Sequence, residues 1–288
     1  MKVKYGVIGG SGLEQFEGGK VLERIEVPTP YGMPSDEILI VDVSGIQAAI
    51  LPRHGKGHRI LPAEVNSRAN IWALKSLGVE TIMAVSAVGS LHQDYQPGQF
   101  AVCDNLIDRT KGRPGSFFGN GLVGHVGFAD PFCPSLRTAI IEALKKTGHP
   151  FHETGTVVTM EGPAFSTRAE SELHRGFKAE LIGMTACPEA KLAREAEICY
   201  ASVAMVTDYD CWHVSEEAVT LEMVLETMRK NVDAVRNLVP AVIPLFARIK
   251  ECSCRTAAAG ALMTAPEFIP YEEKRKLKLL YGKYWHVK

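Results

Sequence analysis

Residues 1–15 read MKVKYGVIGGSGLEQ, and this stretch sets the pattern on which the fold prediction rests. An apolar run over residues 4–8 is followed at once by glycines, before it reaches the length of a signal-peptide core. A short run of this kind, rich in valine and isoleucine and ended by a turn, is typical of a buried β-strand. Similar runs recur along the chain and alternate with segments of helical periodicity. The sequence therefore predicts an α/β fold in which helices cover a largely buried sheet.

The apolar pattern also places the individual elements. Strands are expected at residues 4–8, 37–43, 48–51, 81–85, 100–103, 155–160, 181–184 and 199–206. Helices are expected at residues 63–77 and 134–146, and from 215 to about 249, where Pro240 and Pro244 should disturb the last one. The composition changes after Ile249, and the basic run EEKRKLKLLYGK near the end is interpreted as a solvated helix face.

Composition and charge favour a globular protein whose partners are small molecules. Of the 288 residues, 46% are hydrophobic and 23% are charged, which is enough apolar material for a sizeable core. The 32 basic and 33 acidic residues nearly cancel, so the charge balance indicates no nucleic acid and no anionic membrane as partner. The apolar stretch at residues 238–246 is far shorter than the roughly 20 residues of a membrane helix. We therefore expect a soluble, cytoplasmic protein.

Seven cysteines are scattered along the chain, at positions 103, 133, 187, 199, 211, 252 and 254. No C-x-x-C pair and no histidine at zinc-site spacing accompanies them. Free, mostly buried thiols and no metal site are therefore expected, although the Cys252-Ser253-Cys254 run leaves a second reading open.

The glycine turn after the first strand, Gly9-Gly10-Ser11-Gly12, is the first candidate ligand site. Flexible backbone and unpaired amides make such a turn a natural nest for an anion, and Ser11 adds a hydroxyl. A dinucleotide-binding motif would need glycine where Gln15 stands, and a P-loop would need a Gly-Lys-Ser/Thr run that does not follow. The remaining readings are a bound phosphate or a tight turn without ligand.

Three further segments place polar groups after apolar strands. Arg53-His54 follows the strand at 48–51, and an arginine there can present its planar donors to an oxyanion. Residues 86–90, SAVGS, and the pair Met184-Thr185 also end strands with small or hydroxyl-bearing residues. Because open α/β sheets bind their ligands at strand ends, these turns could hold one phosphate jointly. His54 and His58 lack an accompanying acid, so they do not indicate a metal site.

Two carboxylates end the strand at 199–206, in the run Thr207-Asp208-Tyr209-Asp210. Spaced i and i+2, they point to the same side if the chain stays extended. The functional interpretation is a general acid with a raised pKa, and the alternatives are a helix cap or, less favoured, a metal site.

Several motifs together resemble the purine nucleoside phosphorylase family, and in particular its methylthioadenosine phosphorylase branch. They are VIGGSGL, LPRHGKGH, VNSRANIWALKSLG, VSAVGSL, PGQF, TMEGPAFSTRAES and LIGMTACPEAKLAREAEICYASVAMVTDYDCW, in this order. The resemblance covers about residues 3–249. It implies one α/β domain with a central, mixed, partly barrel-like sheet at residues 1–250, with residues 251–288 as an extension of the same domain. It also implies a homo-oligomer, either a trimer or a dimer of trimers.

The resemblance implies a set of site residues as well. The residues implied for phosphate are Ser11, Arg53, His54, Ser86, Ala87 and Thr185. Those implied for the nucleoside are Phe165 and the Ile182 segment near the base, Met184 at the ribose, Asp208 and Asp210 at the purine edge, and Leu221 with a neighbouring subunit's copy of His125 at the methylthio group. Ser86 stands where the family often has threonine, and Leu221 where some relatives have a smaller aliphatic residue.

The implied activity is phosphorolysis of S-methyl-5'-thioadenosine to adenine and 5-methylthioribose 1-phosphate, a step of purine and methionine salvage. Inorganic phosphate is then a co-substrate, no cofactor is needed, and Asp208 is the catalytic acid that protonates the leaving base. The alternative is a phosphorylase of inosine, guanosine or methylthioinosine. The residue at position 208, an acid or an amide, distinguishes these two activities. A nucleotide-binding module without catalysis and a calcium-dependent nucleoside hydrolase are less favoured.

Heat-stable members of the family carry a similar Cys-Ser-Cys tail. The resemblance of this chain to them implies disulfides between Cys252 and Cys254 and between Cys133 and Cys199. A Cys-x-Cys ring is strained and cytoplasmic disulfides are rare, so free thiols remain the alternative.

Overall fold

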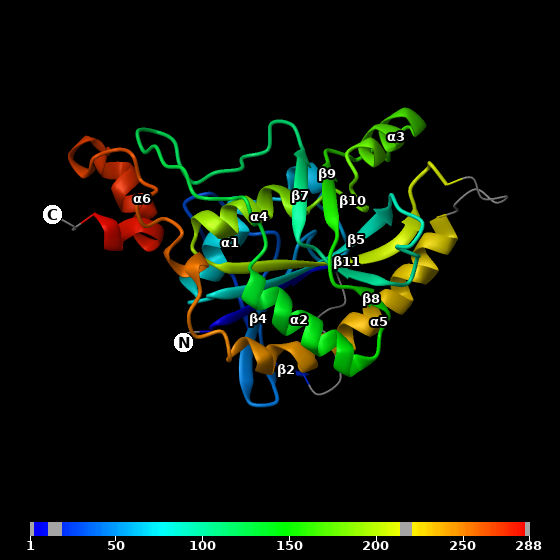
Figure 1. Ribbon diagram of the computed structural model, residues 1–288. Helices are drawn as coiled ribbons and strands as arrows, with labels where there is room; N and C mark the ends of the chain where they lie inside the picture. Colours follow the sequence, from blue (N-terminus) through cyan, green and yellow to red (C-terminus); the bar gives the residue numbers. More distant parts are fainter. Residues whose placement is uncertain (1–2, 11–18, 214–220, 286–288) are drawn as a thin grey trace.

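The computed structural model describes residues 3–10, 19–213 and 221–285, except for the side chains of residues 221–225 and 228. Helices lie on both sides of one sheet, as Figure 1 shows. The strands are β1 (Tyr5–Gly9), β2 (Gly19–Ile25), β3 (Ile38–Val43), β4 (Ile46–Pro52), β5 (Thr81–Ser90), β6 (Phe100–Val102), β7 (Asn105–Arg109), β8 (Phe151–His152), β9 (Thr156–Met160), β10 (Leu181–Gly183) and β11 (Cys199–Tyr209).

The sheet has eleven strands and both parallel and antiparallel pairs. Its main path runs β2-β3-β4-β1-β5-β10-β9-β7, and a branch leads from β5 through β11 and β6 to β8. β5 pairs in parallel with β1 and β11 but antiparallel with β10. The predicted α/β fold with a mixed, helix-flanked sheet is confirmed. The sheet is not closed, so the barrel-like character expected from the resemblance does not extend to a closed barrel.

The helices are α1 (Ser67–Ser76), α2 (Pro134–Thr147), α3 (Arg168–Gly176), α4 (Ala186–Glu195), α5 (Leu221–Phe246) and α6 (Tyr271–Tyr281). Four short 3-10 turns accompany them: η1 (Pro62–Glu64), η2 (Ser253–Thr256), η3 (Pro266–Phe268) and η4 (Gly282–Tyr284). α2 shows why its ends could be predicted. Pro134 occupies its first turn, where no N–H is needed, and Gly148 ends it with a φ of 71°.

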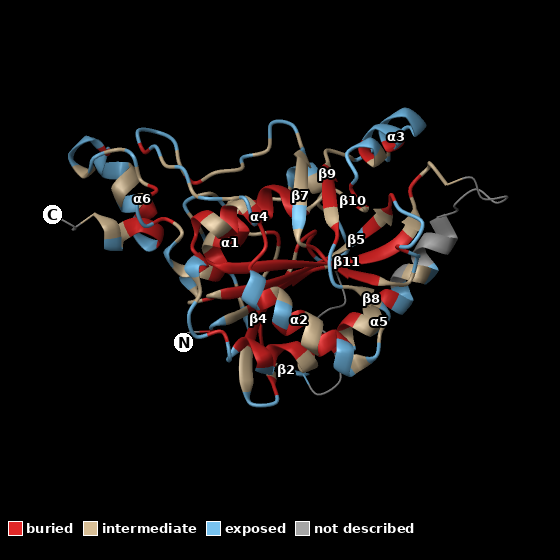
Figure 2. Ribbon diagram, in the orientation of Figure 1, coloured by how far each residue is buried: buried red, intermediate tan, exposed pale blue. Residues whose placement is uncertain are grey.

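Two hydrophobic cores lie on the two sides of the sheet. α1, α4 and α6 contribute Leu74, Leu192 and Leu277 to the first core, whereas α2 and α5 contribute Leu136 and Leu238 to the second. Figure 2 shows the buried residues concentrated in the strands and on the helix sides that face them. The sheet therefore forms the middle of three layers.

α5 continues through Pro240 and Pro244 to Phe246, so neither proline ends the helix. Each proline removes one helical N–H bond. Buried neighbours such as Leu238, Val239 and Val242 pack into the second core and offset that loss.

Three strands, β2, β7 and β8, and two helices, α3 and α4, were not among the elements expected from the sequence. β2 is largely exposed and polar, β7 is polar, and β8 has only two residues. α4 contains Pro188 and a non-helical Cys187, which hide its periodicity. α6 covers the basic run, and its Leu277 and Leu280 are buried, so only one face of it is solvated.

Within the described residues, none of the helices has the length and apolar character needed to cross a membrane.

Candidate active site

The central strand β5 is paired along the whole of one edge but only along part of the other. β11 follows it from Thr81 to Ser90. On the opposite edge, β1 pairs with residues 81–84 of β5, and β10 pairs with Gly89 and Ser90. Among the described residues, no strand therefore pairs with residues 85–88 on this edge. Backbone polar groups alternate between the edges of a strand, which turns the amide of Ala87 toward this gap. We call residues 85–88 and their surroundings the β5 gap; it lies at the carboxyl end of β1, where open α/β sheets bind ligands.

Arg53 lies at one side of the β5 gap, directly after β4. Its backbone amide donates to the Gly9 carbonyl at 2.8 Å, and its Nη1 donates to the Val85 carbonyl at 2.9 Å. Nε and Nη2 each donate to one carboxylate oxygen of Glu189 at 2.9 Å. Both side chains are almost fully buried, and the Tyr200 hydroxyl donates to the same carboxylate at 2.7 Å.

This pairing decides the charge of Arg53. Burial alone would lower the pKa of the guanidinium, but the Glu189 carboxylate outweighs it and the pKa is raised. Three of the five N–H groups of Arg53 are used in the contacts above, which leaves two for a further acceptor. A fixed, charged arginine at the gap is suited to an anion.

His54 follows Arg53 and is also buried, at 8% exposure. Burial and the neighbouring Arg53 charge lower the pKa of its ring to about 4. The ring is therefore neutral at pH 7, with Nδ1 2.9 Å from the Ile60 carbonyl and the ring stacked on His58. A neutral ring whose Nδ1–H is used by Ile60 offers only an acceptor at Nε2. Any contact of His54 with an anion must therefore come from its backbone amide.

Two hydroxyls meet at the other side of the gap. Ser86 Oγ of β5 lies 2.9 Å from Oγ1 of Thr185, the residue that precedes α4. Ala87, the next residue of β5, is exposed. The structure thus brings Arg53, Ser86, Ala87 and Thr185 to one place, and their binding of phosphate stays a prediction. Ser11 lies outside the described residues.

Asp208 follows a β-bulge near the end of β11. Val206 pairs with Val88 and Asp208 with Gly89, so Thr207 is an extra residue that re-aims the side chains. Burial raises the pKa of Asp208 to about 6 against the opposing hydrogen bond from Thr207, and the charge of Asp210 adds to the rise.

The Thr207 hydroxyl lies 2.6 Å from Asp208 Oδ1 and 3.1 Å from the Val88 carbonyl, and it has one proton for these two oxygens. A hydroxyl that donates to Asp208 stabilises the ionised carboxylate. Burial outweighs this contact, so the carboxyl holds a proton at a pH where an exposed aspartate has lost it.

Asp210 lies beside Asp208, as its spacing predicted. Its backbone amide donates to the Ser90 carbonyl at 2.9 Å, and its buried Oδ2 has no hydrogen-bond partner among the described residues. A Cβ on Gly89 would lie 3.2 Å from Asp208 Oδ2 and 3.7 Å from Asp210 Cβ. Both acids therefore border the same glycine, on the strand that carries Ser86 and Ala87.

Met184 and Phe165 lie on two loops that Arg113 ties together. Arg113 Nη1 donates to the Met184 carbonyl at 2.7 Å, and its Nε donates to Glu161 at 3.0 Å. Met184 Sδ packs so closely on Gly162 that a Cβ there would lie 2.6 Å from the sulfur. Phe165 is 83% exposed, so its ring has no packed partner within this chain's described residues.

Among the described residues, no hydrogen bond joins His125 to this group, and the side chain of Leu221 is not among them. His125 is exposed, and its backbone amide donates to the Ala261 carbonyl, which ties it to the C-terminal segment. Leu221 is the first residue of α5, and its side chain lies outside the described residues.

The site contains residues that the sequence did not single out: Glu189, Tyr200, Thr207 and Arg113. Each acts on a predicted residue instead of facing the gap. The one available signal was Glu189, an acid within the short run Ala186-Cys187-Pro188-Glu189-Ala190 that follows Thr185.

Taken together, the group can hold an anion at the β5 gap and deliver a proton from Asp208 on the neighbouring strand β11, beside Gly89. It offers no metal site: within the described part of the chain, the only group of side chains with metal-ligating geometry is Cys133, Cys199, Cys252 and Cys254. Cys199 begins β11, nine residues before Asp208, which separates the two places by about 30 Å at the rise of a strand.

The buried pair predicts a stability effect. Changing Glu189 to Gln leaves the Arg53 charge buried without a counter-charge, so the free energy of unfolding should fall by about 3–5 kcal/mol. The control is Glu142→Gln, which breaks exposed pairs with Lys146 and Arg248 and should lower the free energy of unfolding far less. Urea unfolding followed by circular dichroism measures both. Equal losses in the two variants would contradict the role given to the Arg53–Glu189 pair.

Comparisons with known proteins agree with this geometry. The sequence profile of the phosphorylase superfamily matches residues 4–244. The chain is 47% identical to S-methyl-5'-thioadenosine phosphorylase of Geobacter sulfurreducens over 285 residues, covering 99% of this chain and 100% of that protein.

Solved structures give the same result. A methylthioadenosine phosphorylase from an Antarctic soil metagenomic library superposes with a TM-score of 0.93 at 43% identity, covering 97% of this chain and 99% of the other. The Schistosoma mansoni methylthioadenosine phosphorylase in complex with adenine gives 0.85 at 38% identity, covering 91% and 99%. The chain therefore belongs to the phosphorylase superfamily, in the family of the S-methyl-5'-thioadenosine phosphorylases.

Proposed function

We propose that this protein is an S-methyl-5'-thioadenosine phosphorylase, which converts its nucleoside and inorganic phosphate to adenine and 5-methylthioribose 1-phosphate. The observation that carries the proposal is the position of Asp208, a carboxyl with a raised pKa beside the β5 gap and its charged arginine. The relatives of the same name support it. The reaction takes part in purine and methionine salvage.

In this proposal phosphate binds in the β5 gap. The two free N–H groups of Arg53, the hydroxyls of Ser86 and Thr185 and the amide of Ala87 are the donors, joined by Ser11 and by the backbone amide of His54. Phosphate is an acceptor on every side, and the site supplies donors from several elements. No cofactor is required.

The nucleoside lies between this phosphate and the two acids. Asp208 faces N7 and the 6-amino group of adenine, and the unpartnered Asp210 Oδ2 accepts from the same amino group. Met184 packs on the ribose and Phe165 covers the base. Leu221 and a neighbouring subunit's copy of His125 surround the methylthio group. This requires a homo-oligomer, a trimer or a dimer of trimers, which we expect in the cytoplasm.

The chemistry uses the two ends of the site together. As the bond from ribose to purine breaks, positive charge grows on the sugar and negative charge on the base. The phosphate anion stabilises the sugar and attacks its anomeric carbon. Asp208 gives its proton to N7, a contribution of roughly 10²- to 10⁴-fold in rate. Holding both substrates in line supplies much of the remainder.

The first test is the phosphate requirement. Adenine release from S-methyl-5'-thioadenosine should depend on added phosphate and should yield a sugar phosphate, because the anion is the nucleophile. The release is followed by chromatography in phosphate-free and phosphate-containing buffer. Equal release in both buffers would identify a hydrolase and refute the proposal.

Asp208→Asn tests base recognition. A protonated carboxyl pairs with an N7 acceptor and a 6-amino donor, whereas a 6-oxo group needs the donor that an asparagine amide supplies. The variant should shift the ratio of kcat/KM from methylthioadenosine toward methylthioinosine by about 10- to 100-fold, or about 1.4–2.8 kcal/mol. Asp94→Asn, an exposed aspartate elsewhere, should leave the ratio unchanged. An unchanged ratio in Asp208→Asn, or a wild type that prefers inosine, would favour the 6-oxopurine alternative.

The pH profile tests the proton on Asp208. Because its folded pKa is raised to about 6, the neutral acid is present below that pH and is lost above it. In the free enzyme, kcat/KM should therefore fall as the pH rises through about 6. Inorganic phosphate also changes its ionisation near neutral pH. The wild-type profile is therefore divided by the profile of Asp208→Asn, in which only the ionisation of phosphate remains. A flat quotient would contradict the role of Asp208 as acid.

A further inference from the structure

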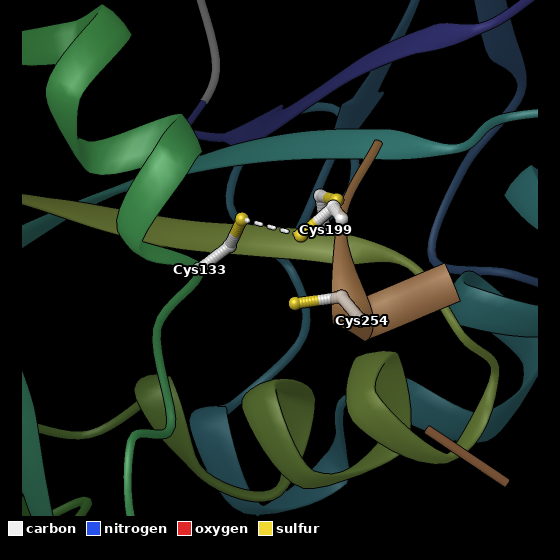
Figure 3. A group of neighbouring side chains, drawn as sticks. Cys133, Cys199 and Cys254 are labelled. Carbon is white, nitrogen blue, oxygen red and sulfur yellow. Dashed lines mark hydrogen bonds between the residues drawn. The ribbon is translucent and has the colours of Figure 1, made fainter. Parts of the chain in front are cut away.

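Four cysteines from distant parts of the chain meet on the second core, and the proposed reaction uses none of them. Their sulfurs all lie within 4.8 Å of one another. Figure 3 shows Cys133, Cys199 and Cys254 converging on one point. The fourth is Cys252. We call these four residues the cysteine cluster.

Three elements build the cluster. Cys199 begins β11, and Cys133 is the residue before α2. The Cys133 amide donates to the Tyr200 carbonyl at 2.8 Å, which fixes the start of α2 against the start of β11. Cys252 is extended and Cys254 lies in η2, so Cys252-Ser253-Cys254 offers two sulfurs over one turn.

No disulfide joins these residues. All seven cysteines are free, so the structure contains neither the Cys252–Cys254 nor the Cys133–Cys199 bridge expected from heat-stable relatives. Cys133 Sγ lies 3.5 Å from Cys252 Sγ, too far for a bond. In a tetrahedral zinc site with Zn–S distances of about 2.3 Å, the sulfurs are about 3.8 Å apart. The spacing of the cluster matches four thiolates around one ion better than two disulfides.

The surroundings suit a closed site. Cys133 and Cys199 are fully buried, Cys254 is 3% exposed, and all three belong to the second core. Cys252 is partly exposed and provides the entry path. A zinc ion with four thiolates carries net negative charge. The amino end of α2 beside Cys133 favours such a charge, and so does Arg194, which donates to the carbonyls of Asp130 and Pro131.

We propose that the cysteine cluster binds one zinc ion through its four sulfurs. Four protein ligands leave no open position, so the ion is structural. It fastens η2, the start of the C-terminal segment, to the sheet and to α2. The linear spacing of the cysteines did not predict this site, because its four ligands come from three separate segments.

The test uses the full-length protein purified with reductant. Native mass spectrometry and elemental analysis should find one zinc per chain, and replacement of zinc by Co²⁺ should give the absorption of a tetrathiolate site. Cys252→Ser with Cys254→Ser should bind zinc more weakly by more than about 100-fold, the upper range of what outer-shell changes alone cost. Cys103→Ser, a fully buried cysteine outside the cluster, is the matched control and should keep the zinc.

A second measurement does not depend on how well the variants fold. In the wild type, zinc should slow the reaction of Cys252 with a thiol reagent, and a chelator should restore it. Zinc-free protein that binds no added zinc while all its thiols remain reduced would overturn the proposal. A second result would also overturn it. If protein that has been reduced and then reoxidised binds no zinc, and its mass is lower by the hydrogens lost in two disulfides, the four cysteines form disulfides instead.

Discussion

The buried ion pair of Arg53 and Glu189 is the interaction on which the proposed site depends. It joins the end of β4 to α4 across 136 residues of chain, and Tyr200 of β11 and the Val85 carbonyl of β5 complete it. The arginine is too deeply buried to stay charged alone. The carboxylate keeps it charged, and the fork geometry fixes where its remaining N–H groups point. An arginine on a mobile surface loop would carry the same charge, but its N–H groups would not be held in one direction.

β5 relates the two halves of the proposed chemistry. The gap on one edge exposes Ser86 and Ala87, and the bulge in β11 on the other edge sets Asp208 against Gly89. Glycine leaves room there, since a Cβ at this position would lie 3.2 Å from Asp208 Oδ2 and would crowd the acid. Part of the anion site and the proton donor thus lie on two neighbouring, hydrogen-bonded strands, β5 and β11. The pairing of these two strands sets their spacing.

The sequence predicted the elements whose signal is local and missed those whose reason lies elsewhere in the chain. The apolar runs around Val7, Val85 and Val203 identify strands because burial on both faces requires them. The hydroxyls and Arg53 could be predicted as a site from strand ends, and the family resemblance added the roles. Glu189, Thr207 and Arg113 were missed because each acts only through a distant partner. The bulge at Thr207 leaves no pattern in a single sequence, and the convergence of the four cysteines appears only once the chain is folded.

The long-range pairing of β5 limits the order in which the strands of the sheet can pair during folding. Its neighbour β1 precedes it in the chain, but the Val88 carbonyl accepts from the Thr207 hydroxyl, 119 residues later. During synthesis the growing chain therefore waits with one edge of its central strand uncovered until β11 has left the ribosome. Contacts of such high sequence separation make folding slow. The strand that organises the site is thus also the one that most needs protection from other chains before the sheet is complete.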